Sequence, residues 1–146
     1  MAGQTVLILV GPEYDDLEVW YPKYRLEAAG IKAPLAGTGE STYTGKYGYP
    51  CSVEGSVTDF DPATLTGVLA PGDWAPDKLR RDPAVLRLAQ KVNERGGLIA
   101  SICHGPWVLI SAGIVAGKRV TGSIGVKDLT AFGEVMVGWL NAHKSR

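Results

Sequence analysis

The chain has 146 residues, 45% of them hydrophobic, and its fifteen Lys and Arg residues balance its fifteen Asp and Glu residues at a formal net charge of zero. A chain of this length buries roughly 68–70% of the surface that it exposes when unfolded, which predicts one domain over residues 1–146 that needs no disulfide or metal for stability. The balanced charge argues against nucleic acid or an anionic membrane as a partner, because both attract an excess of Lys and Arg.

The amino-terminal segment is not expected to be a targeting signal. It carries no positive charge, and its apolar run, residues 6–10, is too short for a signal peptide or a membrane span. These features predict a cytoplasmic protein. In a reducing compartment its two cysteines, Cys51 and Cys103, are expected to be two free thiols.

The first predicted elements are a strand and a helix. Residues 5–10 read TVLILV, an apolar run without alternation that is typical of a strand covered on both faces. Residues 16–29 have apolar side chains at helical spacing, acids at the start and Gly30 after the end. A second strand after Gly30 is interrupted by Pro34, and residues 37–55 are expected to form an irregular or hairpin region.

The second half of the chain alternates strands with helices. Residues 67–70 and 98–102 are predicted to be short buried strands. Between them, Asp82 and Pro83 are expected to be the N-cap and the first residue of a helix, and after the second strand another helix is expected at residues 107–112. This alternation predicts an α/β fold, with a parallel sheet covered by helices on both faces.

Cys103 is the strongest candidate for a reactive residue. It lies in a tight turn between a predicted strand and a predicted helix, which would expose its thiol at the carboxyl edge of the sheet. The start of a helix favours a thiolate, because its N–H groups point at the sulfur. His104 is a candidate base or ion-pair partner, and Gly105 would let the turn close. The alternative is that Cys103 is a small buried hydrophobic residue.

Acidic residues follow the first strand and could meet this thiol, because parallel strands end at one edge of the sheet. Glu13, Asp15 and Asp16 lie where acids cap a helix and complement its dipole, and this is the interpretation that we favour for them. Glu18 lies one turn further into the helix and is expected to be partly buried. A carboxyl group close to a thiolate could stay protonated and donate a hydrogen bond to the sulfur.

A third loop leaves the carboxyl end of the strand at residues 67–70. Backbone N–H groups near Gly72 and Asp73 could stabilise an oxyanion beside the thiol. Trp74 is either a wall of the pocket or an exposed anchor of an interface. Asp77 either caps the short helix that follows or pairs with the histidine after the reactive cysteine.

Other motifs give no sign of a cofactor or a metal. Residues 37–39 read GTG but lack the rest of a dinucleotide-binding fingerprint, and Gly117 and Lys118 are not part of a phosphate-binding loop. With only His104 and His143 and no clustered cysteines, a zinc site is not expected. Cys51 is expected to be an ordinary, partly buried thiol.

Several segments together resemble the ThiJ/PfpI superfamily, in particular its PfpI intracellular-protease-like branch. The resemblance covers residues 6–126 and rests on the segments LILVGPEYDDLEVWYPKYRLEAAG, TGKYGYP, LAPGDWAPDKLRRDP and SICHGPWVLISAGIVAGKRVTG. It implies a flavodoxin-like sandwich, no metal, and a homodimer or larger homo-oligomer. It also implies that Cys103 is the nucleophile, that His104 is the histidine of this branch, and that Glu18 is the acid that contacts the sulfur. Asp77 stands where the branch has a Glu that reaches the histidine of a neighbouring subunit.

The chain departs from the family pattern at three places. Asp73 replaces the second glycine of a Pro-Gly-Gly loop, which puts a negative charge where an oxyanion would develop unless the side chain points away. Asp77 is one methylene shorter than the Glu of the family. After Asp128 the chain runs directly into a segment that resembles the last helix, so two strands of the family pattern, about 20–30 residues with their connections, are not found. Either this sequence omits a stretch or the chain is a shortened member of the family. We expect the exposed sheet edge to be covered by a partner chain or by local rearrangement.

The resemblance implies a cysteine-dependent, hydrolase-like enzyme of the peptidase, deglycase or glyoxalase class. Its substrate would be a small carbonyl compound, a glycated adduct or a peptide. Cys103 would attack an electrophilic carbon, His104 would move the proton with the help of Asp77 from another subunit, and Glu18 would hold the thiolate. Backbone N–H groups near Gly72 and the nucleophile would bind the oxyanion. The alternative is a non-catalytic stress-response or redox-sensing oligomer whose cysteine is oxidised reversibly.

Overall fold

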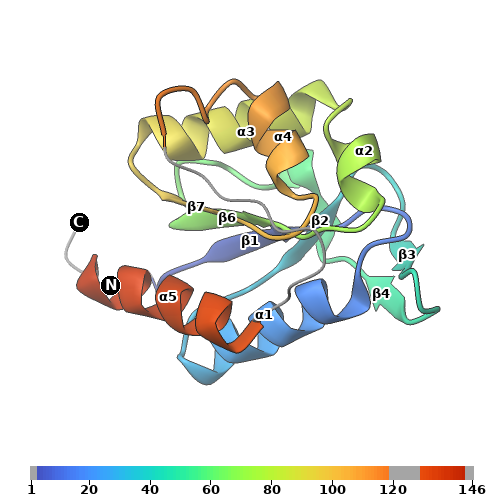
Figure 1. The fold of residues 1–146 in the computed structure, drawn as a ribbon, viewed down its shortest axis with the longest axis horizontal. Helices are drawn as coiled ribbons and strands as arrows, with labels where there is room; N and C mark the ends of the chain where they lie inside the picture. Colours follow the sequence, from blue (N-terminus) through green and yellow to red (C-terminus); the bar gives the residue numbers. More distant parts are fainter. Residues whose placement is uncertain (1–2, 119–128, 144–146) are drawn as a thin grey trace.

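The computed structural model describes residues 3–118 and 129–143 and is built around a parallel sheet (Figure 1). The strand order is β5-β2-β1-β6-β7, and each neighbouring pair is parallel. The sheet consists of β1 (Val6–Leu9), β2 (Leu35–Gly37), β5 (Gly55–Ser56), β6 (Gly67–Ala70) and β7 (Leu98–Ser101). A separate antiparallel hairpin consists of β3 (Thr42–Thr44) and β4 (Pro50–Ser52).

Helices cover both faces of this sheet. On one face, α1 and α5 lie side by side, and on the other face lie α2, α3 and α4 (Figure 1). The helices are α1 (Asp16–Ala28), α2 (Ala75–Leu79), α3 (Pro83–Glu94), α4 (Pro106–Ser111) and α5 (Leu129–Ala142), with a single 3-10 turn at η1 (Val57–Asp59). The prediction of a three-layer, flavodoxin-like α/β fold is therefore confirmed.

The predicted first strand and the predicted helix starts agree with the structure. All four residues of β1 are almost completely buried, as expected for a strand with helices on both sides. Asp15 caps α1, because its carboxylate accepts hydrogen bonds from the N–H groups of Leu17 and Glu18. Asp82 caps α3 in the same way, and Pro83 is the first residue of that helix. These caps satisfy N–H groups that have no partner inside the helix.

The region between α1 and β6 was predicted in outline only. Thr5 and Lys32 form an isolated bridge, and regular pairing resumes after Pro34, where β2 begins. Residues 37–55 contain the hairpin that was one of the two expectations. The short strand β5 was not predicted, because two residues are too few to produce a periodic pattern.

The carboxyl-terminal segment contains the helix that was expected from its sequence. Helix α5 packs on α1, and the Gln4 side chain donates a hydrogen bond to the Leu140 carbonyl at 2.8 Å. Residues 119–128 lie outside the described residues. The structure therefore does not test the prediction that two strands are missing after Asp128. Within residues 3–118 and 129–143, β7 is an edge strand, and no helix is long and apolar enough to cross a membrane.

Cys51 is a buried thiol on the hairpin. It lies opposite Tyr43 and is completely buried, whereas the sequence predicted a partly buried side chain. Burial, with a smaller contribution from the Glu54 carboxylate, raises the pKa of Cys51 to about 11. Both cysteines are free.

We expect the stability of the protein to decrease as the pH rises from about 9 to about 11. In the unfolded chain the Cys51 thiol ionises near its ordinary pKa of 9.0, whereas in the folded chain it stays protonated up to about 11. The unfolded state therefore loses its proton first and is favoured over this pH range. Denaturant unfolding at several pH values should show a smaller decrease for Cys51→Ala than for the wild type. Cys103→Ala is the matched control and should retain the wild-type decrease.

Candidate active site

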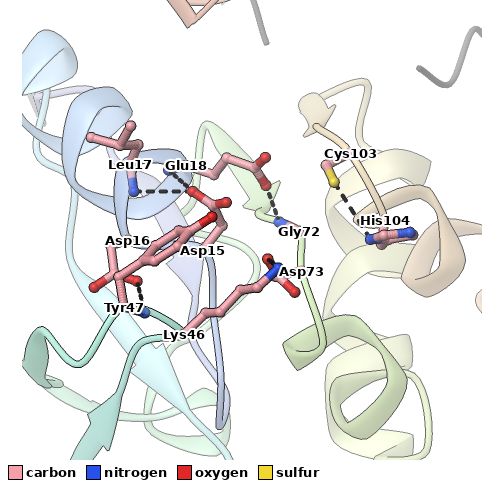
Figure 2. A network of polar contacts seen from close by, with 10 residues as sticks. All are labelled: Asp15, Asp16, Leu17, Glu18, Lys46, Tyr47, Gly72, Asp73, Cys103 and His104. Carbon is pink, nitrogen blue, oxygen red and sulfur yellow. Dashed lines mark hydrogen bonds and ion pairs between the residues drawn. The ribbon is translucent and has the colours of Figure 1, made fainter. Parts of the chain in front are cut away.

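Three loops meet at the carboxyl-terminal edge of the parallel sheet. They follow β1, β6 and β7, and each leads into a helix. The strand order reverses between β1 and β6, and ligands in open α/β sheets bind at such a reversal. Figure 2 shows the loop residue Gly72 between Glu18 on one side and Cys103 on the other. The structure therefore brings together the three loops that the sequence analysis singled out.

Cys103 lies on a strained turn between β7 and α4. Its φ is 56°, in the left-handed region that residues other than glycine rarely adopt. The turn is closed by a hydrogen bond of 2.8 Å from the Gly105 N–H to the Ile102 carbonyl. A side chain at Gly105 would collide with the Ala70 carbonyl, so this position requires glycine. The turn exposes the thiol partly to solvent, as a nucleophile elbow does.

Gly72 separates the Glu18 carboxyl group from the Cys103 side chain. Glu18 is completely buried, more than the sequence predicted, and its Oε2 accepts a hydrogen bond from the Gly72 N–H at 2.7 Å. A Cβ atom at Gly72 would lie 2.5 Å from Glu18 Oε2 and 2.5 Å from Cys103 Cβ. The acid and the cysteine are therefore close neighbours, and only glycine fits between them. The Gly72 N–H is already donated to Glu18, which leaves the neighbouring N–H groups as candidates for an oxyanion.

Two further residues at this edge have left-handed backbones. Glu13 has a φ of 56° and Asp73 a φ of 58°, and with Cys103 they are the three such residues other than glycine in the described part of the chain. The loops of Glu13 and Asp73 are joined through an isolated antiparallel bridge between Tyr14 and Asp73. The Trp74 N–H also donates to the Glu13 carbonyl at 3.3 Å. Each such conformation costs about 1–3 kcal/mol, and such strain is concentrated at functional sites.

The ring of His104 lies beside the thiol and near two indole rings. Its Nδ1 is 3.4 Å from Cys103 Sγ, and the tautomer decides which of the two atoms donates. The Trp107 ring centre is 4.8 Å from that of His104, and the Trp74 ring is nearly parallel to it at 6.5 Å. More than half of the Trp74 side chain is exposed. Trp74 therefore forms a wall beside His104 and still presents surface to solvent, so both interpretations offered for it remain open.

Asp73 is tied to the hairpin by an ion pair. Its carboxylate accepts a hydrogen bond from Lys46 Nζ at 2.9 Å, and this contact raises the pKa of Lys46. Lys46 lies in the turn between β3 and β4, and the Asp16 carboxylate holds this turn by accepting a hydrogen bond from the Tyr47 N–H at 3.0 Å (Figure 2). The same carboxylate accepts a second hydrogen bond from the Tyr49 N–H, also at 3.0 Å. The sequence analysis missed Lys46, because no periodic pattern places a hairpin turn against a loop 27 positions away.

Asp77 pairs with a residue in the turn that follows its own helix. Its carboxylate accepts a hydrogen bond from Arg81 Nη2 at 2.7 Å. Within residues 3–118 no hydrogen bond, ion pair or ring contact joins Asp77 to His104 of the same chain, and the side chain of Asp77 does not cap α2. A contact across a subunit interface stays a prediction. Within the residues that the structure describes, no group of three His, Cys, Asp or Glu side chains could hold a metal ion.

Comparison with known proteins identifies close relatives. A deglycase of Pyrococcus horikoshii is 37% identical over 123 residues, which cover 84% of this chain and 74% of the relative. Deglycase PfpI of Pyrococcus furiosus is 34% identical over the same shares of both chains. An uncharacterised protein of Staphylococcus epidermidis is 34% identical over 139 residues, 92% of this chain and 81% of the relative.

Solved structures agree with this relationship. A ThiJ/PfpI domain protein from Brachyspira murdochii superimposes with a TM-score of 0.85 at 20% identity, over 95% of this chain and 96% of that one. The DJ-1/ThiJ/PfpI-like part of a two-domain protein from Anabaena variabilis gives a TM-score of 0.80 at 34% identity over 89% of this chain, which spans 38% of that protein. The model of the DJ-1/PfpI family matches residues 4–138. With the fold, the reversal of strand order and the strained cysteine turn described above, this match establishes that the chain belongs to the DJ-1/PfpI family.

Proposed function

We propose that this protein is a cysteine-dependent enzyme of the deglycase type that acts on a small carbonyl compound or a glycated adduct. The observation that carries the proposal is the Cys103 turn, whose strained backbone holds the sulfur 3.4 Å from His104 Nδ1 and beside the buried Glu18. Relatives named as deglycases support the substrate class. Peptide hydrolysis is the less favoured reaction, because no named relative cited above is a peptidase.

The proposed reaction begins with the Cys103 thiol. His104 accepts its proton, and the sulfur forms a bond to the carbonyl carbon of the substrate while the carbonyl electron pair moves to oxygen. The resulting oxyanion needs N–H donors that are already oriented. The N–H groups of Asp73 and His104 are the candidates, since the Gly72 N–H is engaged by Glu18 and the His104 nitrogen lies 3.0 Å from the point where a Gly72 Cβ would be. With an α-oxoaldehyde as substrate, His104 returns the proton to the oxyanion and a hemithioacetal forms. Transfer of the hydrogen on that carbon to the neighbouring carbonyl carbon, through an enediol, gives a thioester, which water hydrolyses to a 2-hydroxy acid and the free thiol. A glycated carbinolamine first expels its amine, protonated by His104, and thereby releases the same aldehyde.

Glu18 is proposed to position the thiol. It is buried next to Cys103 and bound to the Gly72 N–H, so it holds α1 against the loop after β6. A buried carboxyl group without hydrogen bonds would be costly, and this bond offsets part of that cost. Glu18 is therefore proposed to act by holding the loop and the thiol in place.

A homo-oligomer is proposed as the active form, with Asp77 directed at His104 of the partner subunit. Within one chain Asp77 forms an ion pair with Arg81, which lies in the turn after α2. The ion pair is partly exposed, and such pairs contribute about 0–1 kcal/mol, so it can rearrange at an interface.

Substitution of the proposed nucleophile should abolish turnover. Cys103→Ala should reduce the conversion of methylglyoxal, or of its adduct with a protected amino acid, to the background rate. His104→Gln should lower kcat by about 10²- to 10⁴-fold, the usual contribution of a general acid–base. Product formation followed by chromatography measures both effects, and Cys51→Ala is the control that should keep its activity. If the wild type converts no substrate but peroxide oxidises Cys103 to a sulfenate that a thiol reduces again, the protein is a redox sensor instead.

Gly72→Ala should disturb the site and the fold together. The added methyl group would collide with Glu18 and Cys103, so we expect a loss of about 1–3 kcal/mol in the free energy of unfolding. Alkylation of Cys103 by iodoacetamide should also change in rate. Gly138→Ala is the matched control, because a Cβ there meets nothing within 4 Å, and its stability should be unchanged or slightly higher. Equal behaviour of the two variants would contradict the close packing at Gly72.

The role of Asp77 can be separated from its ion pair with Arg81. If Asp77 acts on the partner subunit's His104, Asp77→Asn should lower kcat, whereas Arg81→Met should leave it nearly unchanged. If Asp77 only stabilises its helix, the two variants should behave alike. Sedimentation of each variant reports whether the oligomer is still formed.

A further inference from the structure

Asp73 places a carboxylate in the loop whose backbone N–H groups are proposed to bind the oxyanion. The side chain of Asp73 is only 10% exposed, and its residue adjoins Gly72, which separates Glu18 from Cys103. A negative charge at this place would repel an anion that develops beside the sulfur. The left-handed φ of 58° at Asp73 is one that glycine adopts without strain, so the aspartate adds both strain and charge.

Lys46 compensates this charge directly. Its Nζ lies 2.9 Å from Asp73 Oδ2, and among the residues that the structure describes Asp73 forms no other salt bridge. The two side chains differ in exposure, 44% for Lys46 and 10% for Asp73, so the ammonium group reaches the carboxylate from the solvent side. The carboxylate raises the pKa of Lys46, which keeps the ammonium group charged.

The turn that carries Lys46 is held in place by several hydrogen bonds. The Lys46 N–H donates to the Tyr14 carbonyl at 2.9 Å, and the Glu13 N–H donates to the Thr44 carbonyl at 3.0 Å. Asp16, in the first turn of α1, accepts two more hydrogen bonds from the tip of the hairpin. The hairpin is therefore anchored to the loop after β1 on the side from which Lys46 reaches Asp73 (Figure 2).

We propose that Lys46 is a positioning residue of the Cys103 site, which holds the Asp73 carboxylate toward the hairpin and neutralises it, so that an anion can be accommodated beside the sulfur. The inference rests on the proposed function in one respect, that Cys103 is the reacting group. It adds a residue from outside the three loops, and it explains how the chain tolerates an aspartate in a glycine position.

The test compares two alkylating reagents that differ in charge. Iodoacetate is an anion and iodoacetamide is neutral, so the ratio of their rates at Cys103 reports the local electrostatic potential. We expect Lys46→Met to lower the iodoacetate to iodoacetamide ratio by about three- to tenfold, as expected for one uncompensated nearby charge. Lys46→Arg keeps the positive charge and should give the same iodoacetate to iodoacetamide ratio as the wild type. In the Asp73→Gly background, Lys46→Met should change the ratio by much less, because the charge that it neutralises is absent.

Two controls make the result specific. Lys91→Met removes an equal charge from an exposed ion pair with Glu94 on α3, and its ratio should equal that of the wild type. Peptide mass analysis follows Cys103 separately from the buried Cys51. Circular dichroism of each variant verifies that the fold is retained, which is expected for a half-exposed lysine in a turn.

The proposal is overturned if Lys46→Met slows both reagents equally, if the ratio falls as much in the Asp73→Gly background, or if neither reagent reaches Cys103 in the wild type. These outcomes are distinct from a failure of the proposed function. Alkylation requires no turnover. If the protein shows no catalysis but the ratio of the two alkylation rates depends on Lys46 as expected, the proposed function is wrong and the proposed role of Lys46 stands.

Discussion

The hydrogen bond from the Gly72 N–H to the Glu18 carboxyl group is the contact on which the rest of the site depends. It joins the loop after β6 to helix α1 across the point where the strand order reverses, and it is buried at 2.7 Å. Because Gly72 has no side chain, the Glu18 carboxyl group and the Cys103 side chain can both lie close to its backbone. A buried carboxyl group costs free energy unless it is hydrogen-bonded, so the fold and the site require the same contact.

The sheet supports a set of backbone conformations that a single loop could not maintain. Glu13, Asp73 and Cys103 all have left-handed backbones, and all three lie at the carboxyl edge of adjoining strands. The buried strand β1 and the helices on both faces supply the packing that holds these turns. The strain is placed where it exposes a thiol, and the hydrophobic core provides the free energy that offsets it.

The hairpin extends the site beyond the elements that the family pattern names. Asp16 was expected to serve the start of α1, and its carboxylate binds the hairpin turn from which Lys46 reaches Asp73. The same network gives a physical reason why an aspartate can stand in a glycine position. An acidic residue at the start of a helix can therefore also stabilise a turn that lies far from it in the sequence.

The sequence by itself determined the alternation of strands and helices, the caps Asp15 and Asp82, and the place of Cys103 on its turn, because each depends on local patterns of burial, capping and turn formation. Resemblance then singled out Glu18, which a local pattern alone would leave as a partly buried helical residue. Only the tertiary structure decided that the Gly72 N–H is donated to Glu18, that Asp77 pairs with Arg81, and that Lys46 neutralises Asp73. The contacts to Glu18 and Lys46 join residues 54 and 27 positions apart, and the pairing of Asp77 was one of several choices within its reach, so no periodicity in the sequence encodes them.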